Sequence, residues 1–195
     1  MSTAPIEPAR PLLEPAVLPV SLYRAAQVRE LDRIAIEEYG IEGFALMQRA
    51  AEAAFRLLLA KWPGVRRLAV YCGAGNNGGD GYVLAALAMR HGLDVRICMA
   101  TTADRLQGDA RRAWQMAVDA GAAMQPCPAH VDKHAELAVD ALLGIGLSGP
   151  VRDNYAAIID SINAAGKPVL ALDTPSGLCS DTGAILGTAV RADHT

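Results

Sequence analysis

A strand, a glycine-rich loop and a helix follow one another in the middle of the chain, and this order strongly constrains the fold. The apolar run 68–72 leads into residues 73–81, which contain five glycines and two asparagines, and a segment with helical periodicity follows. Glycine lets the backbone take positive φ and approach a ligand closely, while N–H groups converge near the start of a helix. Such a loop is typical of an anion site, most often for phosphate.

Apolar runs and helical periods alternate along most of the chain. We expect strands at 67–72, 94–100, 123–127, 136–143 and 169–173. We expect helices at 21–39, with Ser21 as N-cap, and at 44–61, 80–90, 105–120 and 154–165. Strands that alternate with helices favour a parallel sheet covered by helices on both faces, so the predicted class is α/β.

Length and composition fit one domain that follows a short arm. The chain has 195 residues and is 52% hydrophobic, enough for a sizeable core. Five prolines within residues 1–19 and no apolar signal segment predict that 1–20 is a disordered arm. A net charge of −3 does not favour a nucleic-acid surface, and no apolar run reaches the ~20 residues of a membrane span. Four widely spaced cysteines favour buried, reduced thiols and a cytoplasmic protein.

Two common nucleotide motifs fit the glycine loop poorly. Gly73, Gly75 and Gly78 satisfy GxGxxG. An NAD-binding fold of that kind also has an acidic residue at the end of its second strand, which binds the ribose hydroxyls. Asp94 lies at the beginning of that strand, so ordinary NAD binding is disfavoured. A Walker loop is excluded because no Lys-Ser or Lys-Thr follows Gly81.

Three aspartates stand where strands give way to loops. Asp80 lies in the first glycine loop, Asp140 is near the end of the fourth strand, and Asp173 is at the end of the fifth. The carboxyl ends of parallel strands line the crevice where ligands bind, so the three are expected to share a cleft. The alternative for each one alone is that it caps a helix or a turn.

Carboxylate, amide and hydroxyl oxygens that converge in this way suit a hard cation. The few acids favour a monovalent ion over magnesium. A carboxylate in a partly dry cleft can also act as general acid and base. The histidines are better read as surface or capping residues, and Ser176 lacks the surroundings of a nucleophile.

Three motifs together resemble a known family. They are residues 73–81, residues 140–146, and residues 171–178 with 181–183; the helical segments 27–32 and 46–50 fit as well. This set resembles the NAD(P)H-hydrate epimerase family, the YjeF N-terminal-type domain, over about residues 23–195. The resemblance implies a Rossmann-like three-layer αβα sandwich with a mostly parallel central sheet, and often a homodimer. It also implies interconversion of the R and S forms of NADHX and NADPHX, which are hydrated, damaged nicotinamide cofactors.

The resemblance also implies roles for individual residues. It assigns substrate binding to Asn76, Asn77, Gly78, Gly79, Asp80, Gly144, Ile145, Gly146, Leu147, Ser148, Gly149, Pro150 and Asp173. It assigns a potassium ion to Asn77, Asp140 and Ser176. We choose Asp173 as the catalytic acid and base, because it leaves a strand beside a Pro-Ser-Gly turn.

The chain departs from the family pattern in two places. Gln48 and Ala51 stand where the family commonly has glutamate and glycine. The family usually continues past Thr195 into another strand, so we expect the domain at 21–195 to be truncated at its C-terminus. In one arrangement an ADP- or ATP-dependent dehydratase follows the epimerase. A non-catalytic scaffold or ligand-binding module of the same fold is the alternative function; a kinase of ribokinase type would need a longer chain and a nucleotide site.

Overall fold

The computed structural model describes residues 23–128 and 133–195; the predicted arm 1–20 and Ser21 lie outside this part of the chain. The five expected strands and five expected helices are all present in it. Their bounds are α1 Ala25–Glu37, α2 Gly43–Lys61, β1 Arg67–Cys72, α3 Asn76–Arg90, β2 Asp94–Met99, η1 Ala103–Arg105, α4 Gly108–Asp119, β3 Ala123–Pro126, β4 Leu137–Ala141, α5 Asp153–Ala164 and β5 Val169–Ala171.

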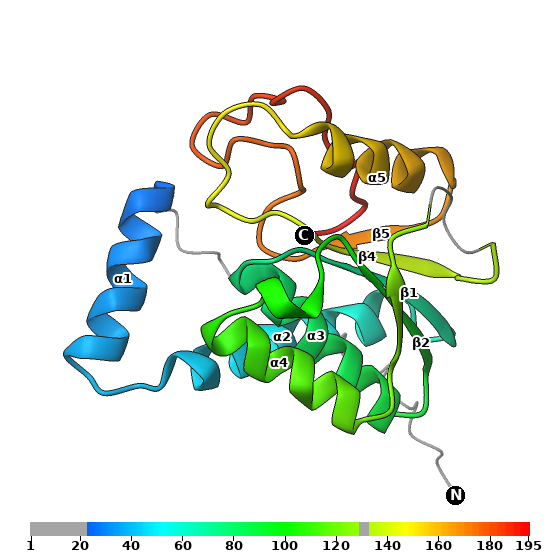
Figure 1. The fold of residues 1–195 in the computed structure, drawn as a ribbon, viewed down its shortest axis with the longest axis horizontal. Helices are drawn as coiled ribbons and strands as arrows, with labels where there is room; N and C mark the ends of the chain where they lie inside the picture. The colour runs from blue at the N-terminus through cyan, green and yellow to red at the C-terminus, as the bar shows by residue number, and fades with distance from the viewer. Residues whose placement is uncertain (1–22, 129–132) are drawn as a thin grey trace, which may run out of the picture.

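The five strands form one sheet in the order β3-β2-β1-β4-β5, and all neighbouring strands pair in parallel. Helices α2, α3 and α4 cover one face of the sheet and α5 covers the other (Figure 1). The predicted α/β class and three-layer αβα sandwich are therefore confirmed. The order reverses between β1 and β4, where parallel sheets of this kind open a ligand crevice at the carboxyl ends of their strands.

Strand β1 shows how the two cores are built. Leu68, Val70 and Cys72 belong to the cluster with α2, α3 and α4, whereas Ala69 and Tyr71 belong to the cluster with α5. Successive side chains of a strand point to opposite faces, so both faces of β1 must be apolar. The continuous apolar run in the sequence is the consequence, and it fixes β1 in the middle of the sheet.

Helix α3 begins earlier than predicted, at Asn76 instead of Asp80. The Gly79 N–H donates to the Gly75 carbonyl at 3.1 Å, so the second half of the glycine loop is already helical. Glycine disfavours a helix interior, which is why the sequence pattern there predicts a loop. Close packing explains the glycines instead: a Cβ on Gly78 would collide with the backbone of Gly73, and one on Gly81 would lie 2.6 Å from the Ala141 Cβ.

The other differences are at element ends. The first helix starts at Ala25, with Arg24 as N-cap, and the helix predicted from Arg105 starts at Gly108. Strand β4 ends at Ala141, two residues before its predicted end, and β5 ends at Ala171, two residues before Asp173. Asp173 is therefore in the loop that follows β5, and its backbone is free of the strand geometry.

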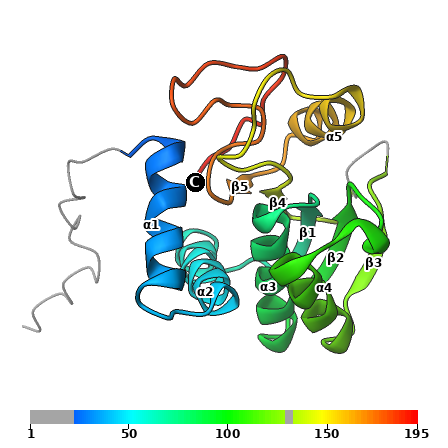
Figure 2. The same ribbon diagram turned by 60° about the vertical axis from the view of Figure 1, so that its left-hand side comes forward.

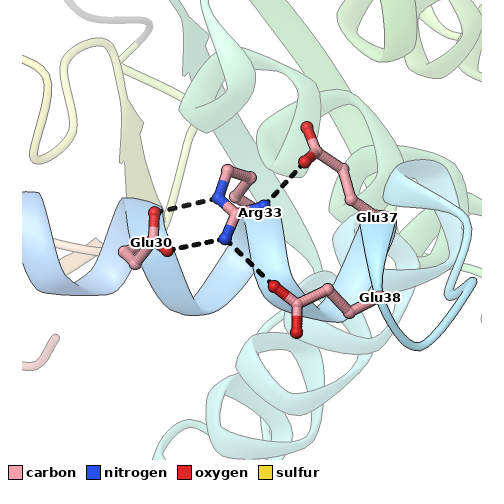
Figure 3. A network of polar contacts seen from close by, with 4 residues as sticks. All are labelled: Glu30, Arg33, Glu37 and Glu38. Atoms are coloured by element: carbon pink, nitrogen blue, oxygen red, sulfur yellow. Dashed lines mark hydrogen bonds and ion pairs between the residues drawn. The ribbon is translucent and has the colours of Figure 1, made fainter.

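Helix α1 stands apart from the three layers, beside α2 (Figure 2). Ala25 is its only buried residue among those described. Its N-terminal end is tied down by the Ala25 N–H, which donates to Asp181 Oδ1 at 2.7 Å. On its solvent face Arg33 pairs with Glu30, Glu37 and Glu38 (Figure 3). Such exposed pairs contribute little to stability, so α1 is held mainly by its few contacts with the rest of the fold.

Candidate active site

A cleft of about 1030 Å³ opens at the carboxyl edge of the sheet. Its walls come from α1, α2, the start of α3, and the loops after β2, β4 and β5. The cleft lies over the point where the strand order reverses, as the parallel topology requires.

The structure brings most of the predicted site residues into this cleft. Those that line it are Asn76, Asn77, Asp80, Gly144, Ile145, Gly146, Leu147, Ser148, Pro150 and Asp173. The predicted residues that do not line it are Gly78, Gly79, Gly149, Asp140 and Ser176. Gly78 and Gly79 are buried inside α3, where a Cβ would meet Gly73 and the Met47 side chain respectively. Asp140 and Ser176 are buried beneath the cleft.

Asp173 has an unusual backbone. Its φ is 64°, and it is the only residue other than glycine with positive φ in the described ranges. Aspartate tolerates this left-handed conformation better than most residues, and such conformations cluster at functional sites. The Ile145 N–H donates to Asp173 Oδ2 at 2.8 Å, and the Thr195 hydroxyl donates to its carbonyl at 3.0 Å. Desolvation, opposed by the Ile145 hydrogen bond, raises the pKa of Asp173 above its usual value.

Gly144 leaves the room that this carboxylate occupies. A Cβ at Gly144 would collide with Asp173 Oδ2 and would lie 3.2 Å from the Asn77 Cβ. Three segments that are far apart in the chain, the start of α3, the loop after β4 and the loop after β5, therefore meet at one point. Glycine is required at position 144 because the Asp173 carboxylate lies so close to the backbone there.

Asp80 is the second carboxylate of the cleft. Burial raises its pKa to about 7, and the negative charges of Asp173 and Asp32 act in the same direction. Asp80 is therefore partly protonated near neutral pH. A carboxyl with a pKa in this range can donate or accept a proton, which makes it a functional candidate on physical grounds.

Asp140 forms a buried junction with the loop after β5. It is fully buried, and its two carboxylate oxygens accept from the Leu142 N–H at 3.1 Å, the Ser176 N–H at 2.8 Å and the Ser176 hydroxyl at 2.6 Å. Desolvation outweighs these hydrogen bonds and raises the pKa of Asp140 to about 6. The Ser176 hydroxyl oxygen also accepts from the Leu143 N–H at 2.8 Å. This Asp140–Ser176 junction joins the ends of β4 and β5.

Asn77 has a buried side chain with unmet hydrogen-bonding capacity. It is 8% exposed, and neither its amide nitrogen nor its amide oxygen has a hydrogen-bond partner. Buried polar groups are rarely left unpaired, so each such case needs an explanation. A ligand or an ion that contacts Asn77 would supply the missing partner.

Helix α1 contributes cleft residues that the sequence analysis missed. Val28, Arg29 and Asp32 line the cleft, and Arg29 Nη1 donates to the Ile145 carbonyl at 3.5 Å. Asp32 follows Arg29 by three residues and Val28 by four, so it is next to both on the helix surface. The missed signal is that this face combines an apolar residue with two opposite charges, but only the docking of α1 shows that it borders the cleft. Tyr155 of α5 also lines the cleft and was not among the predicted site residues.

Comparison with known proteins adds independent information. Residues 43–195 match the family model described as YjeF-related protein N-terminus. The chain is 48% identical over 174 residues to a "Bifunctional NAD(P)H-hydrate repair enzyme Nnr" of Coxiella burnetii, covering 89% of this chain and 36% of that protein. It is 38% identical over 177 residues to an "NAD(P)H-hydrate epimerase" of Limosilactobacillus fermentum, covering 88% of this chain and 82% of that protein.

The fold also has a solved counterpart. The crystal structure of yeast ynu0 matches with a TM-score of 0.80 and 18% identity, over 89% of this chain and 78% of that one. At this identity the match supports the fold alone. The chain spans about a third of the length of the bifunctional relatives and most of the length of the epimerase relative. The family match covers most of the chain and includes all three motifs: the protein belongs to the family of YjeF-related proteins, with the domain found at their N-terminus.

Proposed function

We propose that this domain is an NAD(P)H-hydrate epimerase that interconverts the R and S forms of NADHX and NADPHX. The observation that carries the proposal is Asp173, a carboxylate with positive φ and a raised pKa at the cleft, next to the unpartnered Asn77. The relative from Limosilactobacillus fermentum carries the name of this activity. A non-catalytic scaffold would have no need for an aspartate held in this conformation.

The chemistry asks for one group that moves a proton. The damaged ring carries a hydroxyl at C6, next to the ring nitrogen. Protonation of that hydroxyl by the Asp173 carboxyl lets the nitrogen lone pair expel water and leaves a planar iminium. Water then adds to either face of C6 and returns its proton to the Asp173 carboxylate, so atoms and charge balance. The raised pKa of Asp173 favours the protonated form that starts the cycle.

The start of α3 is suited to the pyrophosphate of the substrate. Gly75 is the N-cap and Asn76 begins a helix of 15 residues, so free N–H groups and the positive end of the helix dipole face the cleft. Anchoring the remote part of the substrate there would place the nicotinamide ring toward Asp173.

The donor set behind the cleft fits a potassium ion, which we propose as a cofactor held by Asn77, Asp140 and Ser176. Asn77 offers an unpartnered amide oxygen, and Asp140 is a buried carboxylate with a raised pKa that a cation would stabilise in its ionised form. A bound potassium would supply positive charge beside the substrate and join the three loops. Replacing sodium by potassium at fixed ionic strength should raise the melting temperature by a few degrees, about the gain for an ion at ten times its Kd. Identical melting in both salts would refute the ion site.

The activity is tested with pure S- or R-NADHX, by following the epimer ratio by chromatography. Asp173→Asn should slow epimerisation by roughly 10²–10⁴-fold. Asparagine also tolerates positive φ, so the variant should fold normally, which circular dichroism can verify. Asp153→Asn, at the start of α5, is the matched control and should react at the wild-type rate. A folded Asp173→Asn variant with normal turnover would remove Asp173 from this role, and an inactive wild type would favour the scaffold alternative.

Partners and compartment are further proposals. We propose a homodimer that buries the exposed apolar side chains of α1 and of the turn after it, which include Leu31, Ile36 and Tyr39. Sedimentation at increasing concentration, with Leu31→Glu as the disrupting variant, tests this.

Fusion to an ADP- or ATP-dependent dehydratase is suggested by the bifunctional name of the Coxiella burnetii relative. Cysteines that are free in the structure are in keeping with a reducing, cytoplasmic compartment. No helix within the described part of the chain is long and apolar enough to span a membrane.

A further inference from the structure

An arginine lines the cleft on the side of β2, and Asp173 lines it on the side of β5. Asp173 follows β5, whereas Arg105 lies in η1, after β2, and both line the cleft. In the sheet, β1 and β4 separate β2 from β5 (Figure 1). Three strand spacings of ~4.8 Å put the ends of these two strands about 14 Å apart. The segments that carry the two residues thus leave the sheet at a separation that suits opposite ends of one extended dinucleotide.

The backbone around Arg105 is fixed while its side chain is available. Leu106 is buried in the core directly after it, and Arg111 Nη1 donates to the Ala103 carbonyl at 2.7 Å, which ties η1 to α4. Arg105 itself is exposed in the cleft, and within residues 23–128 and 133–195 its guanidinium takes part in no ion pair or hydrogen bond. A free guanidinium on a rigid support is suited to a planar, bidentate contact with phosphate.

The acid next to Arg105, Asp104, acts on it through its charge but forms no ion pair with it. Asp104 adjoins Arg105 but does not line the cleft. Its carboxylate accepts from the Thr102 side chain and from its own backbone N–H, which lowers the pKa of Asp104, and the positive charges of Arg105 and Arg111 lower it further. In dinucleotide folds an acid after the second strand binds the ribose 2′-hydroxyl, whereas an arginine nearby accommodates a 2′-phosphate. The cleft therefore offers the phosphate-binding arrangement.

The order of strands sets the direction of the substrate. With the nicotinamide ring toward Asp173 after β5, and the pyrophosphate at the start of α3, the adenosine extends toward the end of β2. Resting on the proposed function, we propose that Arg105 binds the 2′-phosphate of the adenosine ribose and makes the enzyme prefer NADPHX to NADHX.

The kinetic test compares both substrates in matched variants. Arg105→Gln should lower kcat/KM for NADPHX by roughly 10–100-fold, the value of a charge-assisted contact, and leave kcat/KM for NADHX within about twofold. Arg152→Gln is the control, because Arg152 lines the cleft before α5, away from β2. It should leave the ratio between the two substrates unchanged. An unchanged ratio in Arg105→Gln, or a wild type that prefers NADHX, would overturn the inference.

A binding test does not depend on epimerase activity. Adenosine 2′,5′-bisphosphate and adenosine 5′-monophosphate differ only in the 2′-phosphate, and calorimetry should show at least ~10-fold tighter binding of the bisphosphate to the wild type. Arg105→Gln should bind both equally. A preference that survives in Arg105→Gln, or no detectable binding of the bisphosphate, overturns the inference. If the bisphosphate preference holds but neither damaged cofactor is epimerised, the phosphate site stands and the proposed function fails.

Discussion

The cleft has a rear wall, the loops held by the Asp140–Ser176 junction, and a front wall, helix α1. The two are built in opposite ways. Behind it, the Asp140–Ser176 junction is fully buried and links two strand ends through three hydrogen bonds to one carboxylate. In front, α1 buries only Ala25 among its residues and reaches the rest of the fold through single contacts such as Arg29 with the Ile145 carbonyl. The difference indicates that the sheet fixes the position of Asp173, whereas α1 contributes charge and closure that can change without disturbing the core.

The largest expected effect comes from breaking the rear wall. Asp140→Ala leaves the Leu142 and Ser176 N–H groups buried without an acceptor, and should lower the free energy of unfolding by about 3–5 kcal/mol. Urea unfolding at pH 7 measures this. Asp94→Ala, at the exposed start of β2, should cost less than ~0.5 kcal/mol. A loss below 1 kcal/mol in Asp140→Ala would mean that the junction is not what fixes the strand ends.

A smaller effect concerns Asp80 of α3, which lines the cleft. Its pKa rises from 3.8 to about 7 on folding, so between these values the native state binds more protons than the unfolded state. Stability from this group therefore falls as pH rises from about 4 to 7. Asp80→Asn should raise the free energy of unfolding at pH 8 by about 2 kcal/mol. This is roughly half of the free energy that corresponds to a shift of about three pKa units at a fully buried group.

The measurement is urea unfolding of wild type and Asp80→Asn from pH 4 to pH 8. The two should be equally stable near pH 4 and diverge above it. A slope that remains in the variant up to about pH 6 would belong to Asp140, whose pKa is raised to about 6, together with Asp173, whose pKa is also raised. Parallel curves over the whole range would contradict the assignment of Asp80 as a buried titrating group.

The smallest effect is expected from loosening the front wall. Asp181→Ala removes the acceptor of the Ala25 N–H and should cost about 1 kcal/mol or less in global stability. Hydrogen exchange in α1 should accelerate several-fold, while exchange in β1 stays unchanged. Asp160→Ala, which removes a similar contact with Thr188, is the control and should leave α1 unaffected. Equal acceleration in α1 and β1 would show that α1 unfolds only with the whole domain.

The sequence predicts one wall of the cleft better than the other, for a physical reason. Asp140 and Asp173 can be placed because parallel strands bring their carboxyl ends to one edge, whatever the details of packing. The start of α3 was missed because Gly78 and Gly81 are needed for close packing, although glycine disfavours helices. Asp32 and Arg29 were missed because only the docking of α1 determines what its faces contact. The roles of the site residues stay predictions.

The hydrogen bond between Ala25 and Asp181 joins positions 156 residues apart. On the ribosome, α1 emerges before the sheet, but its acceptor is synthesised only after the whole sheet. Domains fold largely as units while the chain grows from its N-terminus. The nascent chain therefore carries α1 undocked until the sheet has been synthesised, and the cleft gains its front wall late in the folding of this domain.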